Sequence, residues 1–198
     1  MILMENILVK KPKLIILCGP SGSGKSTIVK FLLEHIPHLA LSVSVTTREK
    51  RESEIHSKDY FFMNEEEFLK KKNSGEFLEY EEVYPGRFYG TLKTYIDELL
   101  HQGKNVILDI DVMGAIKIKK YNKQTLSIII KPPSLKILKE RLLKRQTDTP
   151  EHLAIRLKKA HIELSYAKMF DEKIINRELN TTCMKALIMV QKFIEKEY

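Results

Sequence analysis

The sequence predicts an α/β fold in which a parallel β-sheet is flanked by helices. Apolar runs of strand length alternate along the chain with apolar residues at helical spacing, and this alternation is typical of a parallel sheet. A glycine-rich turn joins the first run to the first helical pattern, and two segments interrupt the alternation. The 198 residues, of which 43% are hydrophobic and 30% charged, are enough for one domain with a buried core.

Four apolar runs predict the strands of the sheet. The first spans residues 14–18 and ends at a glycine, and the second spans residues 105–110. Residues 126–130 form the third run, and the isoleucine pair at 174–175 belongs to a fourth, shorter strand. Their lengths and apolar character indicate buried strands.

Helical spacing of apolar residues predicts helices over residues 27–35, 92–102 and 182–195. Gly103 follows the second of these, and glycine is typical of the position just after a helix. These helices are the elements expected to cover the sheet.

Two segments interrupt the alternation. Residues 42–91 contain short aromatic-rich strands and a helix that opens at Asn64 with Glu67 three residues on, and residues 134–159 contain a Lys- and Arg-rich helix followed by a helix that opens at Pro150. We interpret both segments as inserts in a single domain spanning residues 12–198. Its core is expected to consist of residues 12–41, 92–133 and 160–198.

Composition narrows the class of protein. No apolar run approaches the roughly 20 residues of a membrane-spanning helix, and the N-terminus lacks the pattern of a signal peptide. Cys18 and Cys183 lack the spacing of metal ligands, which favours inert thiols in a reducing, cytoplasmic compartment. The formal net charge of +8 is scattered along the chain, so we expect solvated helix faces and no nucleic-acid partner.

The glycine-rich turn carries the strongest chemical signal. Gly19-Pro-Ser-Gly-Ser-Gly-Lys-Ser26 fits the P-loop pattern at every fixed position, between a predicted strand and a predicted helix. Backbone N–H groups of such a turn and the helix N-terminus bind phosphate oxygens, while Lys25 supplies a positive charge and Ser26 a Mg²⁺ ligand. The predicted ATP-binding residues are Gly19, Pro20, Ser21, Gly22, Ser23, Gly24, Lys25, Ser26 and Thr27.

A carboxylate at the end of the second strand is the candidate partner of this turn. Asp109 stands where a second Mg²⁺ ligand is expected, at the carboxyl edge of the sheet. The alternative is that Asp109 caps the helix that begins near Val112. The expected metal ligands are therefore Ser26 and Asp109, and the expected cofactor is Mg²⁺ bound with ATP.

Beyond the P-loop, the chain resembles the guanylate kinase family from about Pro12 to Phe193. The resemblance is carried by four further segments: Ser42-Val-Ser-Val-Thr-Thr-Arg48 with Arg51, Glu54 and Asp59-Tyr60-Phe61-Phe62; Phe77-Leu-Glu79; Gly86-Arg-Phe-Tyr-Gly-Thr91; and Ile107-Leu-Asp-Ile-Asp111. It implies a P-loop NTPase-type sheet with a GMP-binding insert at residues 42–91 and a helical lid at residues 134–159. It also implies transfer of the γ-phosphoryl group of ATP to GMP or dGMP, in purine metabolism, by a monomer or homodimer.

The resemblance assigns roles by position. The residues implied to bind the GMP phosphate are Arg48, Arg51, Tyr60 and Tyr89, with Glu54 in the same signature. Those implied to recognise guanine are Ser44, Glu79, Thr91 and Asp111. Lid arginines are implied to contact the ATP phosphates and the transferred group, which gives as catalytic residues Lys25, Arg48, Arg141, Arg145 and Arg156. Two departures from the family pattern are Ser57 and Gln146, both at positions where glycine is common.

The residue types suit these roles on chemical grounds. Arginines form forked, charge-assisted contacts with phosphate. Guanine presents N1–H and N2–H₂ donors on one edge, which a carboxylate such as Glu79 accepts, whereas the bare N1 acceptor of adenine would be repelled. A GMP phosphate already carries most of two negative charges near neutral pH, since its second pKa is roughly 6, so no catalytic base is expected.

Alternatives remain open at this stage. Arg48 and Arg51 could also belong to a solvated turn, and Glu79 to an acidic patch on the surface. Tyr60 and Tyr89 could be core aromatics, and the lid arginines could lie on a solvated helix face. Competing functions are a kinase of the same fold with another acceptor, such as a phosphorylated sugar, and a non-catalytic protein-binding module. A nucleic-acid binder is a third reading, supported by the net charge alone.

Overall fold

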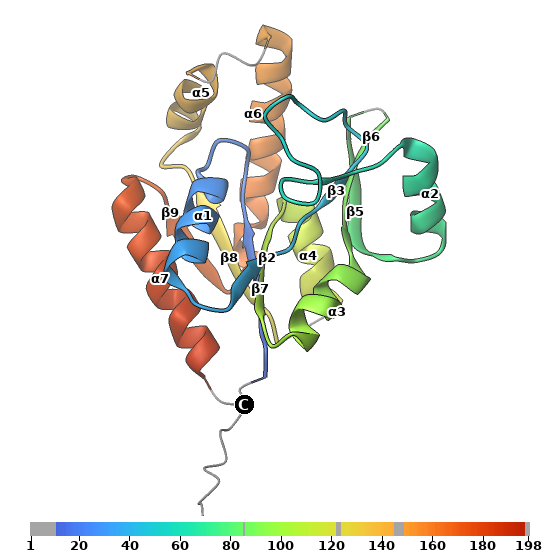
Figure 1. Ribbon diagram of the computed structural model, residues 1–198. Helices are drawn as coiled ribbons and strands as arrows, with labels where there is room; N and C mark the ends of the chain where they lie inside the picture. Colours follow the sequence, from blue (N-terminus) through green and yellow to red (C-terminus); the bar gives the residue numbers. More distant parts are fainter. Residues whose placement is uncertain (1–10, 85, 122–123, 145–148, 197–198) are drawn as a thin grey trace, which may run out of the picture.

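A five-stranded parallel sheet forms the centre of the computed structural model, which describes residues 11–84, 86–121, 124–144 and 149–196 (Figure 1). The strand order is β2-β7-β1-β8-β9. The strands are β1 (Leu14–Cys18), β2 (Leu39–Leu41), β7 (Asn105–Asp109), β8 (Leu126–Lys131) and β9 (Glu172–Ile175). All four predicted strands are confirmed, whereas the short β2, which pairs with β7, was not predicted.

The sheet is covered on both faces because alternate residues of each strand point to opposite sides. On one face, Ile15 and Leu17 pack against α1 (Lys25–His35) and α7 (Leu179–Glu195). On the other face, Ile16 packs against α3 (Lys93–His101) and α4 (Val112–Tyr121). Each fully buried Leu or Ile contributes about 1.5–3 kcal/mol relative to exposure, so these two clusters hold the strand ends in fixed register.

The first insert is a second, four-stranded sheet with the order β4-β3-β6-β5. Its elements are β3 (Val45–Thr46), β4 (Phe61–Phe62), α2 (Glu65–Asn73), β5 (Phe77–Tyr84) and β6 (Arg87–Leu92). The predicted helix start is confirmed, because the Asn64 side chain accepts a hydrogen bond from the Glu67 N–H at 2.8 Å. Phe68, fully buried, stacks on Phe77 and Phe88 and gives the insert its own small core.

The second insert contains α5 (Leu135–Leu143) and the start of α6 (Pro150–Ser165). Ser134 and Thr149 cap the two helices, and Leu138, Leu142 and Leu153 pack in a cluster between them. The two helices lie together at the top of Figure 1, apart from α2 of the first insert, which lies at the right. The expected lid boundary at residues 159–160 falls inside α6, so this helix continues from the lid segment into the core.

Within the described parts of the chain, no helix is long and apolar enough to cross a membrane.

Candidate active site

The P-loop turn joins β1 to α1 as its sequence predicts. Gly19, Gly22 and Gly24 all have positive φ, at 139°, 85° and 100°, and a Cβ at Gly19 would collide with the Ile130 carbonyl oxygen. Lys25 Nζ donates to the Gly19 carbonyl at 2.6 Å. The turn thus holds the Lys25 ammonium beside the backbone at the N-terminus of α1, where a helix favours bound anions.

Ser26 and Asp109 meet at the carboxyl edge of the sheet. Parallel pairing places Leu17 of β1 opposite Asp109 of β7, and Ser26 Oγ donates to Asp109 Oδ2 at 2.6 Å. A hydroxyl and a carboxylate oxygen beside a phosphate-binding turn are the ligand types that Mg²⁺ uses together with substrate phosphates, so these residues fit the metal. The side chain that caps α4 is that of Asp111 and not that of Asp109, because the Gly114 N–H of α4 donates to Asp111 Oδ1 at 2.8 Å.

A cavity of about 720 Å³ begins at this point and extends to the insert. Much of the predicted site lines it: Gly19, Ser21, Lys25, Ser26, Ser44, Arg51, Tyr60, Glu79, Tyr89, Asp109, Asp111 and Arg156. Predicted residues that do not line it are Pro20, Gly22, Ser23, Gly24, Thr27, Arg48, Glu54, Thr91 and Arg141. Arg145 and Gln146 lie outside the described residues.

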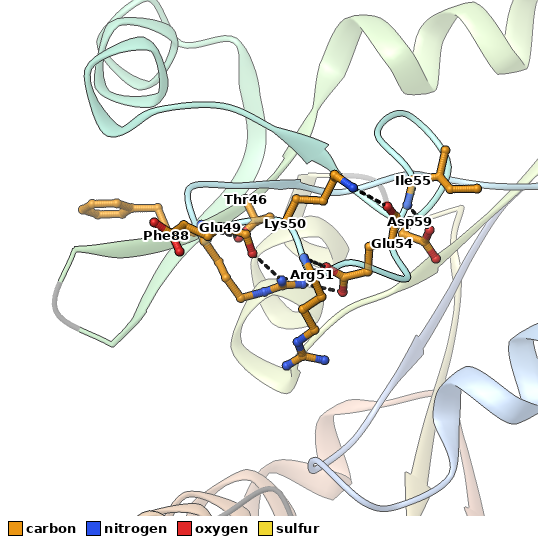
Figure 2. Close-up of polar contacts among 9 residues, drawn as sticks. Thr46, Glu49, Lys50, Arg51, Glu54, Ile55, Asp59 and Phe88 are labelled. Carbon is orange, nitrogen blue, oxygen red and sulfur yellow. Dashed lines mark hydrogen bonds and ion pairs between the residues drawn. The ribbon is translucent and has the colours of Figure 1, made fainter.

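Arg48 and Arg51 of the first insert take different positions, and Figure 2 shows the Arg51 guanidinium pointing away from Glu54. Arg48 donates both guanidinium branches to Glu54, at 2.7 and 2.8 Å, while the Arg51 side chain lines the cavity. The Arg51 N–H also donates to Glu54, at 2.9 Å. The Arg48 hydrogen bonds lower the pKa of Glu54 to about 2, so Glu54 is a fixed anion that orients the whole turn. Its side chain and that of Arg48 are only 14% and 13% exposed, which excludes a simple solvated turn.

Tyr60 and Tyr89 stand side by side in the cavity wall. Their ring centroids are 5.9 Å apart with the rings nearly edge to face, and the Arg48 guanidinium lies 5.3 Å from the Tyr60 ring centroid. Burial raises the pKa of Tyr60 above its ordinary value. The Tyr60 hydroxyl is therefore a neutral donor near neutral pH, in the wall of the cavity that Arg51 also lines.

The far end of the cavity is acidic and enclosed. Glu79 is only 8% exposed, and Thr91, buried beside it, donates its hydroxyl to Glu79 Oε1 at 2.6 Å. Burial raises the pKa of Glu79 to about 7, against the opposing effect of the Thr91 hydrogen bond, with the Asp111 charge adding to the rise. Glu79 is thus a buried wall residue and no member of a surface acidic patch.

Three charged residues of this end were not predicted as site residues. Glu81 of β5 and Lys159 and Glu163 of α6 line the cavity together with Asp111. Lys159 lies in a lysine-rich helix and Glu81 in a run of glutamates, so neither stands out in the sequence. Helical spacing alone could have placed Lys159 and Glu163 on the face of Arg156, at i+3 and i+7.

The lid arginines differ in position. Arg156 of α6 lies 3.4 Å from Ser21 Oγ of the P-loop and lines the cavity. Arg141 of α5 donates to the Asn176 carbonyl at 2.8 Å, away from the cavity lining. Asn176 in turn donates to the Ser23 carbonyl at 2.8 Å, so Arg141 supports the residue that braces the P-loop.

Comparisons with known proteins identify the family of this chain. The family model described as guanylate kinase matches residues 11–197. The chain belongs to the guanylate kinase family. A guanylate kinase from Bacteroides fragilis is 48% identical over 183 residues, which cover 92% of this chain and 90% of that protein. One from Thermotoga maritima is 43% identical over 187 residues, which cover 94% and 88% of the two chains.

Solved structures agree with the guanylate kinase assignment. The crystal structure of guanylate kinase from Anaplasma phagocytophilum superposes with a TM-score of 0.77 at 31% identity, covering 94% of this chain and 88% of that chain. One departure from the family pattern has a visible cost. Ser57 stands where guanylate kinases commonly have glycine and has a φ of 66°, a conformation that costs a residue with a side chain roughly 1–2 kcal/mol.

Proposed function

We propose that the cavity carries out the guanylate kinase reaction, the ATP-dependent phosphorylation of GMP, with the residues that line it in the roles below. One observation supports this most strongly. The same cavity has the P-loop residues Lys25 and Ser26 at one end, and the buried carboxylate of Glu79 with Asp111 at the other. A phosphate-binding turn and a guanine-type acceptor set thus line one cavity, as phosphoryl transfer between two nucleotides requires.

The P-loop end binds ATP in this proposal. Its backbone N–H groups and Lys25 contact the phosphates, and Ser26 and Asp109 would hold Mg²⁺. The metal, when bound, neutralises charge on the phosphates. Lys25 exchanges its contact with the Gly19 carbonyl for phosphate oxygens, which costs little because the ammonium keeps its hydrogen bonds.

The middle of the cavity binds the GMP phosphate. Arg51, Tyr60 and Tyr89 line it there, and Arg48 lies behind them, held by Glu54. Glu54 serves both arginines as an anchor, through the Arg48 guanidinium and the Arg51 N–H. We therefore assign Glu54 an orienting role within the GMP-binding signature, and Arg48 and Arg51 the task of holding the acceptor oxygen in line with the γ-phosphorus.

The acidic end recognises guanine. Glu79 accepts from N1–H and N2–H₂, Asp111 supplies a second acceptor for the 2-amino group, and Ser44 donates to O6. Thr91 already gives its hydroxyl to Glu79, so we assign it the orientation of that carboxylate. Guanine donors favour the ionised form of Glu79, and GMP binding should therefore lower the pKa of about 7 that this carboxylate has in the unliganded protein.

Transfer itself needs charge stabilisation and no protein base. The GMP phosphate is already nucleophilic, and Lys25 and Arg156 stabilise charge on the transferred group, with Arg141 and Arg145 joining them when the lid closes over the bound nucleotides. The lid also excludes water, which would otherwise hydrolyse ATP. We further propose use of dGMP, a cytoplasmic location, and action as a monomer or homodimer.

Arg51 provides the test of this arrangement. Arg51→Met should raise KM for GMP by about 100-fold while KM for ATP changes less than about twofold, because the lost contact is to the GMP phosphate alone. Lys58→Met, a comparable loss of charge at an exposed residue of the same insert, is the matched control. Unchanged KM for GMP in a folded Arg51→Met protein would remove Arg51 from the phosphate subsite.

A further inference from the structure

Lys159 of α6 reaches across the cavity to two carboxylates on other parts of the fold. Its Nζ lies 3.3 Å from Glu81 Oε1 on β5 of the insert, and 3.6 Å from Asp111 Oδ2, two residues past the end of β7 in the core. All three residues line the cavity. Lys159 therefore joins the helix of the lid segment, the GMP-type insert and the core at a single point.

This ion-pair cluster, Glu81–Lys159–Asp111, lies in a crowded acidic environment. Glu79 of β5 is adjacent to it, and Glu163 of α6, only 4% exposed, is one helical turn beyond Lys159. Like charges this close in a partly buried site repel one another and favour proton uptake. A cation placed among them offsets this repulsion and holds the carboxylates of Glu81 and Asp111 close together.

The electrostatics of the cluster follow this logic. Burial by itself raises the pKa of Asp111, but the hydrogen bonds with Glu81 and the Gly114 N–H, together with the Lys159 charge, outweigh it and hold that pKa below its ordinary value. Burial and the contact with Asp111 raise the pKa of Glu81 to about 7, with Lys159 acting in the opposite sense. Near neutral pH, Asp111 is thus an anion while Glu81 retains a share of one proton.

The position of Lys159 on α6 adds a second consequence. Arg156, three residues earlier on the same helix face, lies 3.4 Å from Ser21 of the P-loop. One face of α6 therefore contacts the ATP end through Arg156 and the base end through Lys159. The ion pairs that hold Lys159 therefore also orient the face of α6 that carries Arg156.

We propose that Lys159 is a positioning and specificity-determining residue for the guanine subsite: with Glu81, it holds the Asp111 carboxylate in place as an acceptor for the 2-amino group and anchors α6 across the cavity. This inference rests on the base-recognition role proposed above for Asp111. It extends that role to two residues that do not themselves contact the reacting phosphates.

The test compares GMP with inosine monophosphate, which has a hydrogen in place of the 2-amino group. Lys159→Met should lower kcat/KM for GMP by about tenfold, the size expected for one charge interaction in a partly exposed cluster, with kcat/KM for inosine monophosphate nearly unchanged. The preference for GMP thus falls by a similar factor. Lys158→Met, at an exposed position of the same helix, is the matched control, and Lys159→Arg should keep most of the preference.

The outcomes separate this inference from the proposed function. Wild-type GMP preference in Lys159→Met overturns it while GMP phosphorylation itself stands, and an equal loss in Lys158→Met overturns it as a general effect on the helix. If circular dichroism shows Lys159→Met to be unfolded, Glu81→Gln decides, because it removes the partner charge of Lys159 and should also lower the preference for GMP; an unchanged preference overturns the inference. Asp111→Asn with undiminished kcat/KM for GMP would instead remove the base-recognition role on which the inference rests.

Discussion

Replacing Glu79 by glutamine should make the protein more stable and less active at the same time. The carboxylate is buried, with a pKa of about 7 in place of its ordinary 4.5. Because one pK unit corresponds to about 1.4 kcal/mol, the difference of about 2.5 amounts to about 3 kcal/mol. That free energy is the cost of keeping an ionised carboxylate at this position in the unliganded fold, and glutamine does not incur it.

The sign of the effect depends on pH. A group whose pKa is raised on folding makes its full contribution to stability at pH values below its unfolded pKa. This contribution is lost as the pH rises through the folded pKa. Wild type should therefore lose up to about 3 kcal/mol of unfolding free energy between about pH 4.5 and pH 7.5, relative to Glu79→Gln. Urea unfolding at both ends of this range measures the difference, with Glu66→Gln at an exposed position as the control.

The catalytic consequence has the opposite sign. Glutamine cannot accept twice from the guanine edge, and a subsite with an unmatched buried group discriminates strongly, so kcat/KM for GMP should fall by at least about 100-fold. KM for ATP should stay within about twofold of wild type. Two results together would refute this reasoning: a difference in unfolding free energy between Glu79→Gln and wild type that does not change with pH, and an undiminished kcat/KM of Glu79→Gln for GMP.

Two further substitutions probe the two ends of the cavity. Lys25→Met should lower kcat by about 100-fold or more with the fold intact, since it removes a charge next to the transferred group, and near-normal turnover would overturn the P-loop assignment. Gly114→Ala places a Cβ 2.7 Å from Glu79 Oε2 in a helix that otherwise favours alanine. It should lower kcat/KM for GMP by about tenfold with no loss of thermal stability, and retained GMP kinetics would show that Glu79 moves freely.

Much of the fold could be predicted from the sequence, because β1, β7 and β8 are mostly apolar runs and the P-loop marks where the first one ends. The missed element, β2, has only three residues, Leu39–Leu41, and is defined by its pairing with β7. Three residues are too few to show the alternation of apolar and polar residues that predicts a strand. Its position depends on a partner more than sixty residues further along the chain.

Site residues could be predicted from the sequence where they belong to a recognisable motif. They could not be predicted where their role depends on contacts with residues distant in the sequence. Arg51 and Glu79 were predicted and line the cavity. Lys159 and Glu81 resemble ordinary solvated charges until α6 is packed beside β5. The pairing of Arg48 with Glu54 likewise needs the turn between them to close.

A coupled assay with the purified protein, ATP and a panel of nucleoside monophosphates measures acceptor specificity directly. The cavity described above predicts rapid formation of GDP and ADP from GMP, with kcat/KM for AMP lower by a factor that approaches about 10⁴, because adenine presents an acceptor to Glu79. Phosphorylation of AMP as efficient as that of GMP would contradict the assignment of the acidic end of the cavity to guanine.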